Sequence, residues 1–111
     1  MDPHTADHRV VLIAQDDPVS SRVMAGWMAR DGHDVICATS ATDAVAKAQR
    51  RDPDVALVDP RMAGAGPSLV SRLRKDRTLR RIPVVMISPD VAARFNAEAL
   101  GECVNAALRT A

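Results

Sequence analysis

Aromatic residues are almost absent from the sequence, which has Trp27, Phe95 and no tyrosine in 111 residues. Proteins that bind single-stranded nucleic acids need several aromatic faces for stacking, so the composition disfavours this function. An excess of charge of one sign is also lacking, because fifteen basic and fourteen acidic residues leave a net charge of +1. A basic run lies between Arg72 and Arg81, but such runs are typical of a solvated face. We therefore expect neither a nucleic acid nor a membrane surface as a partner.

Cysteines and long apolar runs are scarce as well. Cys37 and Cys103 have no CxxC or histidine-paired spacing, which indicates two buried thiols in a reducing cytoplasm and disfavours a disulfide or a metal site. No apolar run is long enough to span a membrane. Residues 1–8 lack the basic and then apolar pattern of a signal peptide. The sequence therefore predicts a cytoplasmic protein with a flexible tail at residues 1–8 and one domain at residues 9–111.

Short apolar runs that end in oxygen-bearing side chains are the main feature that is present. Val10–Ala14 is followed by Gln15 and Asp16, and Val55–Val58 is followed by Asp59. Four or five apolar residues without polar alternation are typical of a strand that is covered on both faces, as in a parallel sheet. These two segments are therefore predicted to be central strands.

Helical patterns lie between the predicted strands. Pro18 begins a helix that runs to about Arg30, with Asp17 as a candidate N-cap. The last apolar run, Cys103–Leu108, fits a strand or a helix, and we interpret it as a fifth strand. The remaining predicted elements are strands at Val35–Ala38 and Ile82–Ile87 and helices at Ala41–Arg51, from Ser68, and at Val91–Leu100. This alternation predicts an α/β fold with a doubly wound parallel sheet.

The predicted strand ends bring together side chains that suit phosphoryl chemistry. In a doubly wound sheet, the residues after the first, third and fourth strands meet at one crevice, which places Asp16, Asp59 and Ser88 together. Carboxylates in one crevice repel each other, and Mg²⁺ relieves this repulsion because it prefers oxygen ligands. A carboxylate can also attack phosphorus as a nucleophile. The pattern therefore predicts a metal-assisted phosphoryl site with Asp59 as the acceptor.

The chain resembles the receiver domain of bacterial two-component response regulators over about residues 9–111. The order and spacing of four segments carry this resemblance: Val10–Ile13 with the acids after it, Pro53–Asp59, Met62 with Gly64, and Ile82–Ser88. The resemblance implies a signalling module that is not an enzyme, with a flavodoxin-like fold and strand order 2-1-3-4-5.

The same resemblance implies a role for each residue at the crevice. Asp59 would accept a phosphoryl group from a phosphohistidine on a sensor histidine kinase or a histidine phosphotransfer protein. Mg²⁺ would be held by Asp16, Asp59 and the backbone carbonyl of Arg61. Ser88 would be the switch hydroxyl that binds the phosphoryl group and draws in the loop that follows it.

Several positions depart from the family pattern. Gln15 stands where the first of two acids is usual, and its amide oxygen would hold Mg²⁺ only weakly, through a water molecule. Ala63 replaces the usual proline, Ala107 falls at the aromatic switch position, and Thr110 falls where the family has a lysine. These departures keep a second hypothesis open: a pseudo-receiver that binds partner proteins without regulated phosphorylation.

The sequence stops at Ala111, before a fifth helix of the expected fold. Without this helix, apolar side chains of the last two strands would lie bare beside the first helix. A bare apolar face of this size favours association, so we expect a homodimer through it, unless the natural protein is longer.

Overall fold

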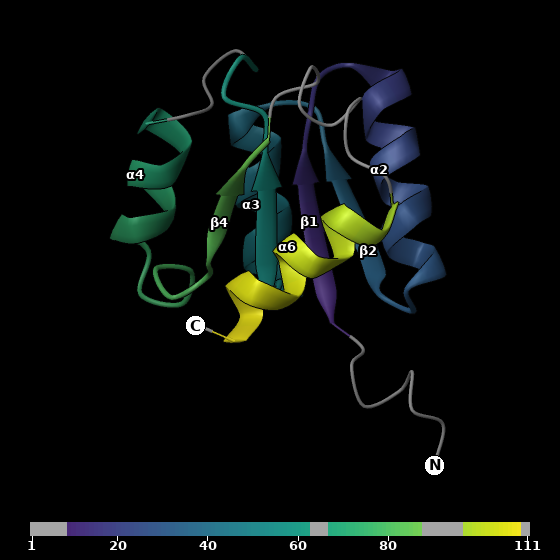
Figure 1. Ribbon diagram of the computed structural model, residues 1–111. Coiled ribbons are helices and arrows are strands. Elements are labelled where there is room, and N and C mark those ends of the chain that lie inside the picture. The colour runs from purple at the N-terminus through teal and green to yellow at the C-terminus, as the bar shows by residue number, and fades with distance from the viewer. Residues whose placement is uncertain (1–8, 63–66, 88–96, 110–111) are drawn as a thin grey trace.

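A parallel sheet of four strands forms the centre of the computed structural model, which describes residues 9–62, 67–87 and 97–109 (Figure 1). The strands are β1 (Val10–Ala14), β2 (Asp34–Ala38), β3 (Val55–Val58) and β4 (Val84–Met86), in the order β2-β1-β3-β4. All three pairings are parallel, so every strand ends at the same edge of the sheet. The two predicted central strands, β1 and β3, are central in the structure.

Helices cover both faces of this sheet. They are α2 (Pro18–Arg30), α3 (Ala41–Arg51), α4 (Pro67–Lys75) and α6 (Ala97–Arg109). The predicted N-cap Asp17 accepts a hydrogen bond from the Ser20 backbone, and Ser40 caps α3 by accepting one from the Asp43 backbone. In Figure 1 α3 lies behind the sheet and α6 in front of it. Side chains of α3 and α4 share one core cluster with the sheet, and side chains of α2 and α6 share the other.

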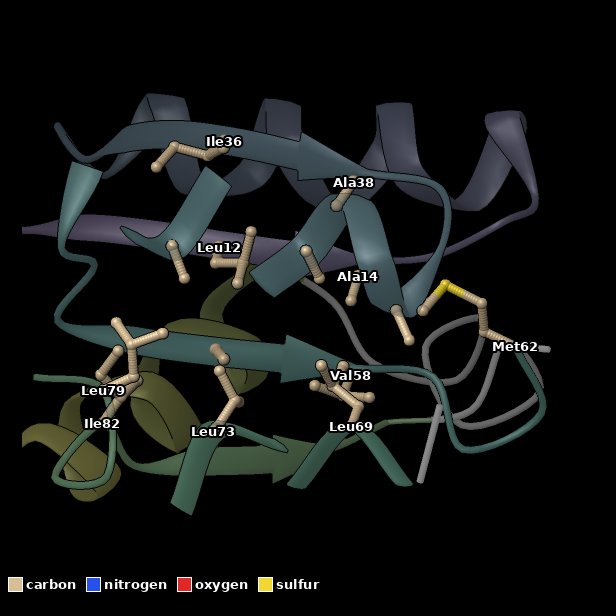
Figure 2. Packing of buried hydrophobic residues seen from close by; sticks show 14 residues of the cluster. Leu12, Ala14, Ile36, Ala38, Val58, Met62, Leu69, Leu73, Leu79 and Ile82 are labelled. Carbon is tan, nitrogen blue, oxygen red and sulfur yellow. The ribbon is translucent and has the colours of Figure 1, made fainter. Parts of the chain in front are cut away.

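The alternation of side chains along β1 and β3 divides the core into two clusters. Leu12 and Val58 belong to the cluster between the sheet and the α3–α4 layer, which Figure 2 shows. Ile13 and Leu57 belong to the cluster under α2 and α6. Because both faces of these strands are buried, their sequences are continuously apolar.

The predicted fifth strand is wrong, since Cys103–Leu108 lies within α6. The apolar positions of α6, Leu100, Val104, Ala107 and Leu108, recur at helical spacing and pack on the sheet. Among the described residues, the expected order 2-1-3-4-5 therefore holds only for its first four strands. The fourth strand, Val84–Met86, is also shorter than predicted.

The predicted bare face beside the first helix is wrong as well, because α6 covers it. α6 contacts α2, β3 and β4, and its Leu100 and Val104 are completely buried. Gly101 leaves room for the residue that follows α2: a Cβ atom at this position would lie 2.8 Å from Asp31 Oδ2. Because α6 covers this face, no bare apolar surface of the described residues favours a dimer there, and the homodimer stays a prediction.

The cysteines and several residues outside the described ranges were also the subject of predictions. Both cysteines are free, but Cys37 is exposed and Cys103 is half-buried, so the prediction of two buried thiols is wrong. Residues 1–8, Ala63, Ser88 and Thr110 lie outside the described residues, as does most of the helix predicted at Val91–Leu100. No helix in the described part of the chain is long and apolar enough to cross a membrane.

Candidate functional site

Asp59 is a buried carboxylate directly after the central strand β3. Only 3% of its surface is exposed. Its backbone nitrogen donates to the Ala14 carbonyl at 3.0 Å, which continues the pairing with β1 beyond the last strand residue. The backbone nitrogen of Arg61 donates to Asp59 Oδ1 at 2.9 Å, so the turn that follows fixes the carboxylate. The sheet and the turn together hold the candidate acceptor in one orientation.

Gln15 lies beside Asp59 at the end of the neighbouring strand. The last register pair of β1 and β3 is Ala14 with Val58, so Gln15 and Asp59 each follow a member of that pair. The Gln15 backbone nitrogen donates to the Ala38 carbonyl at 3.0 Å, which fixes it against β2. Side-chain alternation continues from Ile13 and Leu57 to Gln15 and Asp59, which assigns both to the face under α2 and α6.

The Gln15 side chain is almost completely buried, with 1% of its surface exposed. Its Oε1 accepts a hydrogen bond from the Asp17 backbone nitrogen at 2.9 Å. Its Nε2 is buried and has no hydrogen-bond partner in the described part of the chain. A buried donor without a partner costs about 1–3 kcal/mol, so this atom requires an explanation.

Asp16 and Asp17 follow Gln15 but differ in their surroundings. Asp16 is exposed at the edge of the sheet where the strands end. Asp17 Oδ2 accepts hydrogen bonds from the Ser20 hydroxyl at 2.5 Å and the Ser20 backbone nitrogen at 3.2 Å. These bonds lower the pKa of Asp17, and the bond from the Ser20 hydroxyl has the larger effect. Asp17 is thus committed to capping α2 and does not replace the acid that Gln15 displaces.

The residues at this edge suit a weak Mg²⁺ site. Within residues 9–62, 67–87 and 97–109, no group of three or more His, Cys, Asp or Glu side chains forms a metal cluster. Mg²⁺ needs no such cluster, because it keeps several waters and commonly uses one or two carboxylates together with phosphate oxygens. Asp16 and Asp59, with a backbone carbonyl at Arg61, match this donor chemistry. These roles, and that of Gln15 through a water, remain predictions.

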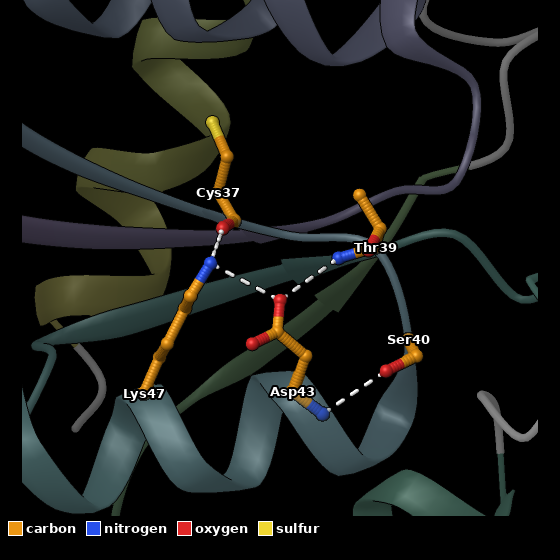
Figure 3. A network of polar contacts seen from close by, with 5 residues as sticks. All are labelled: Cys37, Thr39, Ser40, Asp43 and Lys47. Carbon is orange, nitrogen blue, oxygen red and sulfur yellow. Dashed lines mark hydrogen bonds and ion pairs between the residues drawn. The ribbon is translucent and has the colours of Figure 1, made fainter.

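No lysine serves this site. The chain has two lysines, Lys47 and Lys75. Lys47 Nζ lies 2.7 Å from the Cys37 carbonyl oxygen and 3.1 Å from Asp43 Oδ2, within the polar network that joins β2 to α3 in Figure 3. Lys75 is the last residue of α4, and that end of the helix lies at the opposite edge of the sheet, where the strands begin (Figure 1).

A shallow hollow is present at that opposite edge. It is lined by Arg9, Asn105, Leu108 and Arg109. Its polar side chains are exposed, unlike Asp59 and Gln15, so it lacks a fixed, buried functional group. The buried polar pair at the strand ends is therefore the better candidate for function.

Two curated relatives have similar sequences. The chain is 33% identical to Protein PilH of Pseudomonas aeruginosa over 79 residues, which cover 70% of this chain and 65% of PilH. It is 31% identical to Sensor histidine kinase AruS of the same organism over 106 residues, which cover 89% of this chain and 11% of AruS. The chain thus spans less than two thirds of either relative.

Solved structures of similar fold include a relative of higher sequence identity than 25%. NtrX from Brucella abortus superposes with a TM-score of 0.80 at 26% identity, over 93% of this chain and 28% of NtrX. The family model for the response regulator receiver domain matches residues 11–108, which include β3, all of β1 except its first residue, Gln15 and Asp59. The flavodoxin-like sheet, the buried aspartate after β3 and this match lead to one conclusion: the chain belongs to the response regulator receiver domain family, a module of two-component signalling.

Proposed function

We propose that this receiver domain accepts a phosphoryl group on Asp59 from a phosphohistidine of a sensor histidine kinase or a histidine phosphotransfer protein. The observation that carries the proposal is the Asp59 carboxylate itself, which is 3% exposed, follows a fully buried strand and is oriented by the Arg61 backbone. A carboxylate held rigidly at the crevice of a doubly wound sheet is well placed for attack on a bound phosphoryl group.

The transfer itself needs little from the protein beyond positioning and charge. An Asp59 oxygen forms a bond to phosphorus while the bond from phosphorus to the imidazole nitrogen breaks, and the nitrogen keeps the electron pair. Mg²⁺, when bound, neutralises charge on the transferred group. Asp16, Asp59 and the Arg61 carbonyl would hold it.

The readout of phosphorylation would follow from the family pattern. Ser88 would bind a phosphoryl oxygen and pull the loop after β4 inward, which turns a local charge into a change of surface. The module would act in the cytoplasm, where a kinase domain can reach it, and would signal without being an enzyme.

Intact mass spectrometry tests the proposal. After incubation with Mg²⁺ and acetyl phosphate, or with a competent phosphohistidine donor, the wild type should gain the mass of one phosphoryl group. Asp59→Asn should gain none, and removal of Mg²⁺ should abolish the gain. An unchanged mass with both donors, or an equal gain in Asp59→Asn, would overturn the proposal.

A second candidate is a pseudo-receiver that recognises partners through its surface alone. The specific observation in its favour is the neutral Gln15 beside Asp59, together with the absence of a lysine at this edge of the sheet. Under this hypothesis, partner binding should be the same for the wild type and Asp59→Asn, whatever the supply of phosphodonor. A phosphodonor-dependent change in binding that Asp59→Asn lacks would exclude it.

A further inference from the structure

The orientation of the Gln15 carboxamide follows from its neighbour. The Asp17 backbone N–H, 2.9 Å away, can only donate a hydrogen bond, so the atom that faces it must be the oxygen Oε1. The NH₂ group therefore faces the other way. Nε2 is buried and has no partner in the described ranges, so the residue presents an unused donor at the strand ends.

The position of this donor relates it to Asp59. Both side chains follow the register pair Ala14 and Val58, and both backbones are held by bonds that continue the sheet. A phosphoryl group on Asp59 would bring a charge of nearly −2 to a buried position. Such a group requires donors or cations, because an unpaired buried charge is very unfavourable.

We infer that Gln15 donates a hydrogen bond from Nε2 to an oxygen of the phosphoryl group on Asp59. This inference rests on the proposed function and gives Gln15 a positioning role toward the anion, instead of a role as a weak ligand of Mg²⁺. Neither lysine of the chain supplies a cation at this site, so a neutral N–H donor is available to bind the phosphoryl oxygen in its place. This hydrogen bond also accounts for a buried NH₂ group that has no partner among the described residues.

Beryllofluoride, which mimics a phosphoryl group on a carboxylate, provides the test. Its dissociation constant is measured by fluorine NMR at saturating Mg²⁺ for the wild type, Gln15→Glu and Gln15→Met. Glutamate keeps the oxygen that accepts from Asp17 but loses the donor, and methionine loses the donor without adding charge. Both should bind beryllofluoride about tenfold more weakly, as expected for one lost hydrogen bond to a charged group.

Two further measurements separate the donor role from other roles. In the wild type, the side-chain NH₂ signals of Gln15 should shift when beryllofluoride binds, whereas those of Gln49, the other glutamine of the chain, should not. Mg²⁺ affinity should be the same in Gln15→Met and the wild type. The matched control Gln49→Met, on the exposed surface of α3, should leave both affinities unchanged. Thermal unfolding establishes that each variant is folded.

The outcomes are distinguishable. If the wild type binds beryllofluoride and folded Gln15→Met binds it with the same affinity, the inference is overturned and the proposed function stands. A loss restricted to Gln15→Glu would also overturn it, because charge repulsion then explains the effect. Weaker Mg²⁺ binding in Gln15→Met would assign the amide to the metal instead. Absence of both beryllofluoride binding and phosphorylation in the wild type would overturn the inference together with the proposed function.

Discussion

The backbone nitrogen of Arg61 lies 2.9 Å from Asp59 Oδ1, so Arg61 orients the candidate acceptor through its main chain. Its side chain is exposed. We therefore expect Arg61→Ala to keep the wild-type yield and lifetime of phospho-Asp59, because both the N–H donor and the carbonyl oxygen remain. Intact mass measured over time checks this. A clear loss of yield would instead identify the guanidinium as a substitute for the missing lysine.

Gln15→Asp should tighten Mg²⁺ binding by roughly tenfold, because it adds a carboxylate beside Asp59. The variant should also be less stable than the wild type without Mg²⁺, since two buried carboxylates then repel each other. Thermal unfolding across a Mg²⁺ titration measures both effects, because a ligand of the folded state raises stability by mass action. Gln49→Asp adds the same charge on exposed α3 and should leave Mg²⁺ binding unchanged. Identical titrations for Gln15→Asp and the wild type would contradict a metal site here.

Leu100→Ala should lower the free energy of unfolding by about 2–5 kcal/mol. Leu100 is completely buried between α6 and the sheet, so the substitution leaves a cavity. Urea denaturation measures the change. Asn105→Ala, on the exposed side of the same helix, should change stability by less than about 0.5 kcal/mol. Equal effects of the two substitutions would argue against α6 as part of the core.

Acid should destabilise the domain by protonating three half-buried aspartates. Hydrogen bonds from Ser20 to Asp17, from Lys47 to Asp43 and from Thr78 to Asp76 lower these pKa values below the ordinary 3.8. The unfolded chain then binds more protons than the folded one, so this stabilisation is complete above pH 3.8 and decreases as the pH falls through the lowered values.

Urea denaturation between pH 6 and pH 2.5 checks this expectation. Asp76→Asn removes one of the three titrating groups, so its stability should fall less steeply below about pH 4 than that of the wild type. Parallel curves for the two proteins would show that Asp76 contributes nothing to the acid response.

The sequence predicted the elements whose signals are local. Buried strands are continuously apolar, and Asp17 and Ser40 cap their helices through neighbouring backbone groups, so Val10–Ala14, Val55–Val58 and both helix starts could be found. The segment Cys103–Leu108 was misassigned because its short apolar run fits both periods. The spacing from Leu100 through Val104 to Leu108 was the available signal for a helix.

The positions of two candidate residues followed from the sequence, but their side-chain geometry did not. Asp59 and Gln15 were expected at adjacent strand ends, and the register of β1 with β3 confirms this arrangement. The direction of the Gln15 amide depends on the Asp17 backbone, whose place follows from how α2 begins. No spacing rule contains that information. The exposure of Cys37 was likewise set by the edge position of its strand.

The packing of α6 on α2 also affects how the domain folds during synthesis. Met28 near the start of the chain and Leu100 near its end share one apolar cluster. At ribosomal rates of about 5–20 residues per second, roughly 70 residues of synthesis separate them, which takes about 4–14 s. By the end of this interval β1, α2 and β3 have been synthesised, but the part of the sheet face that α6 covers is still open. The nascent chain therefore leaves part of an apolar face open until residues 97–109 can pack on it.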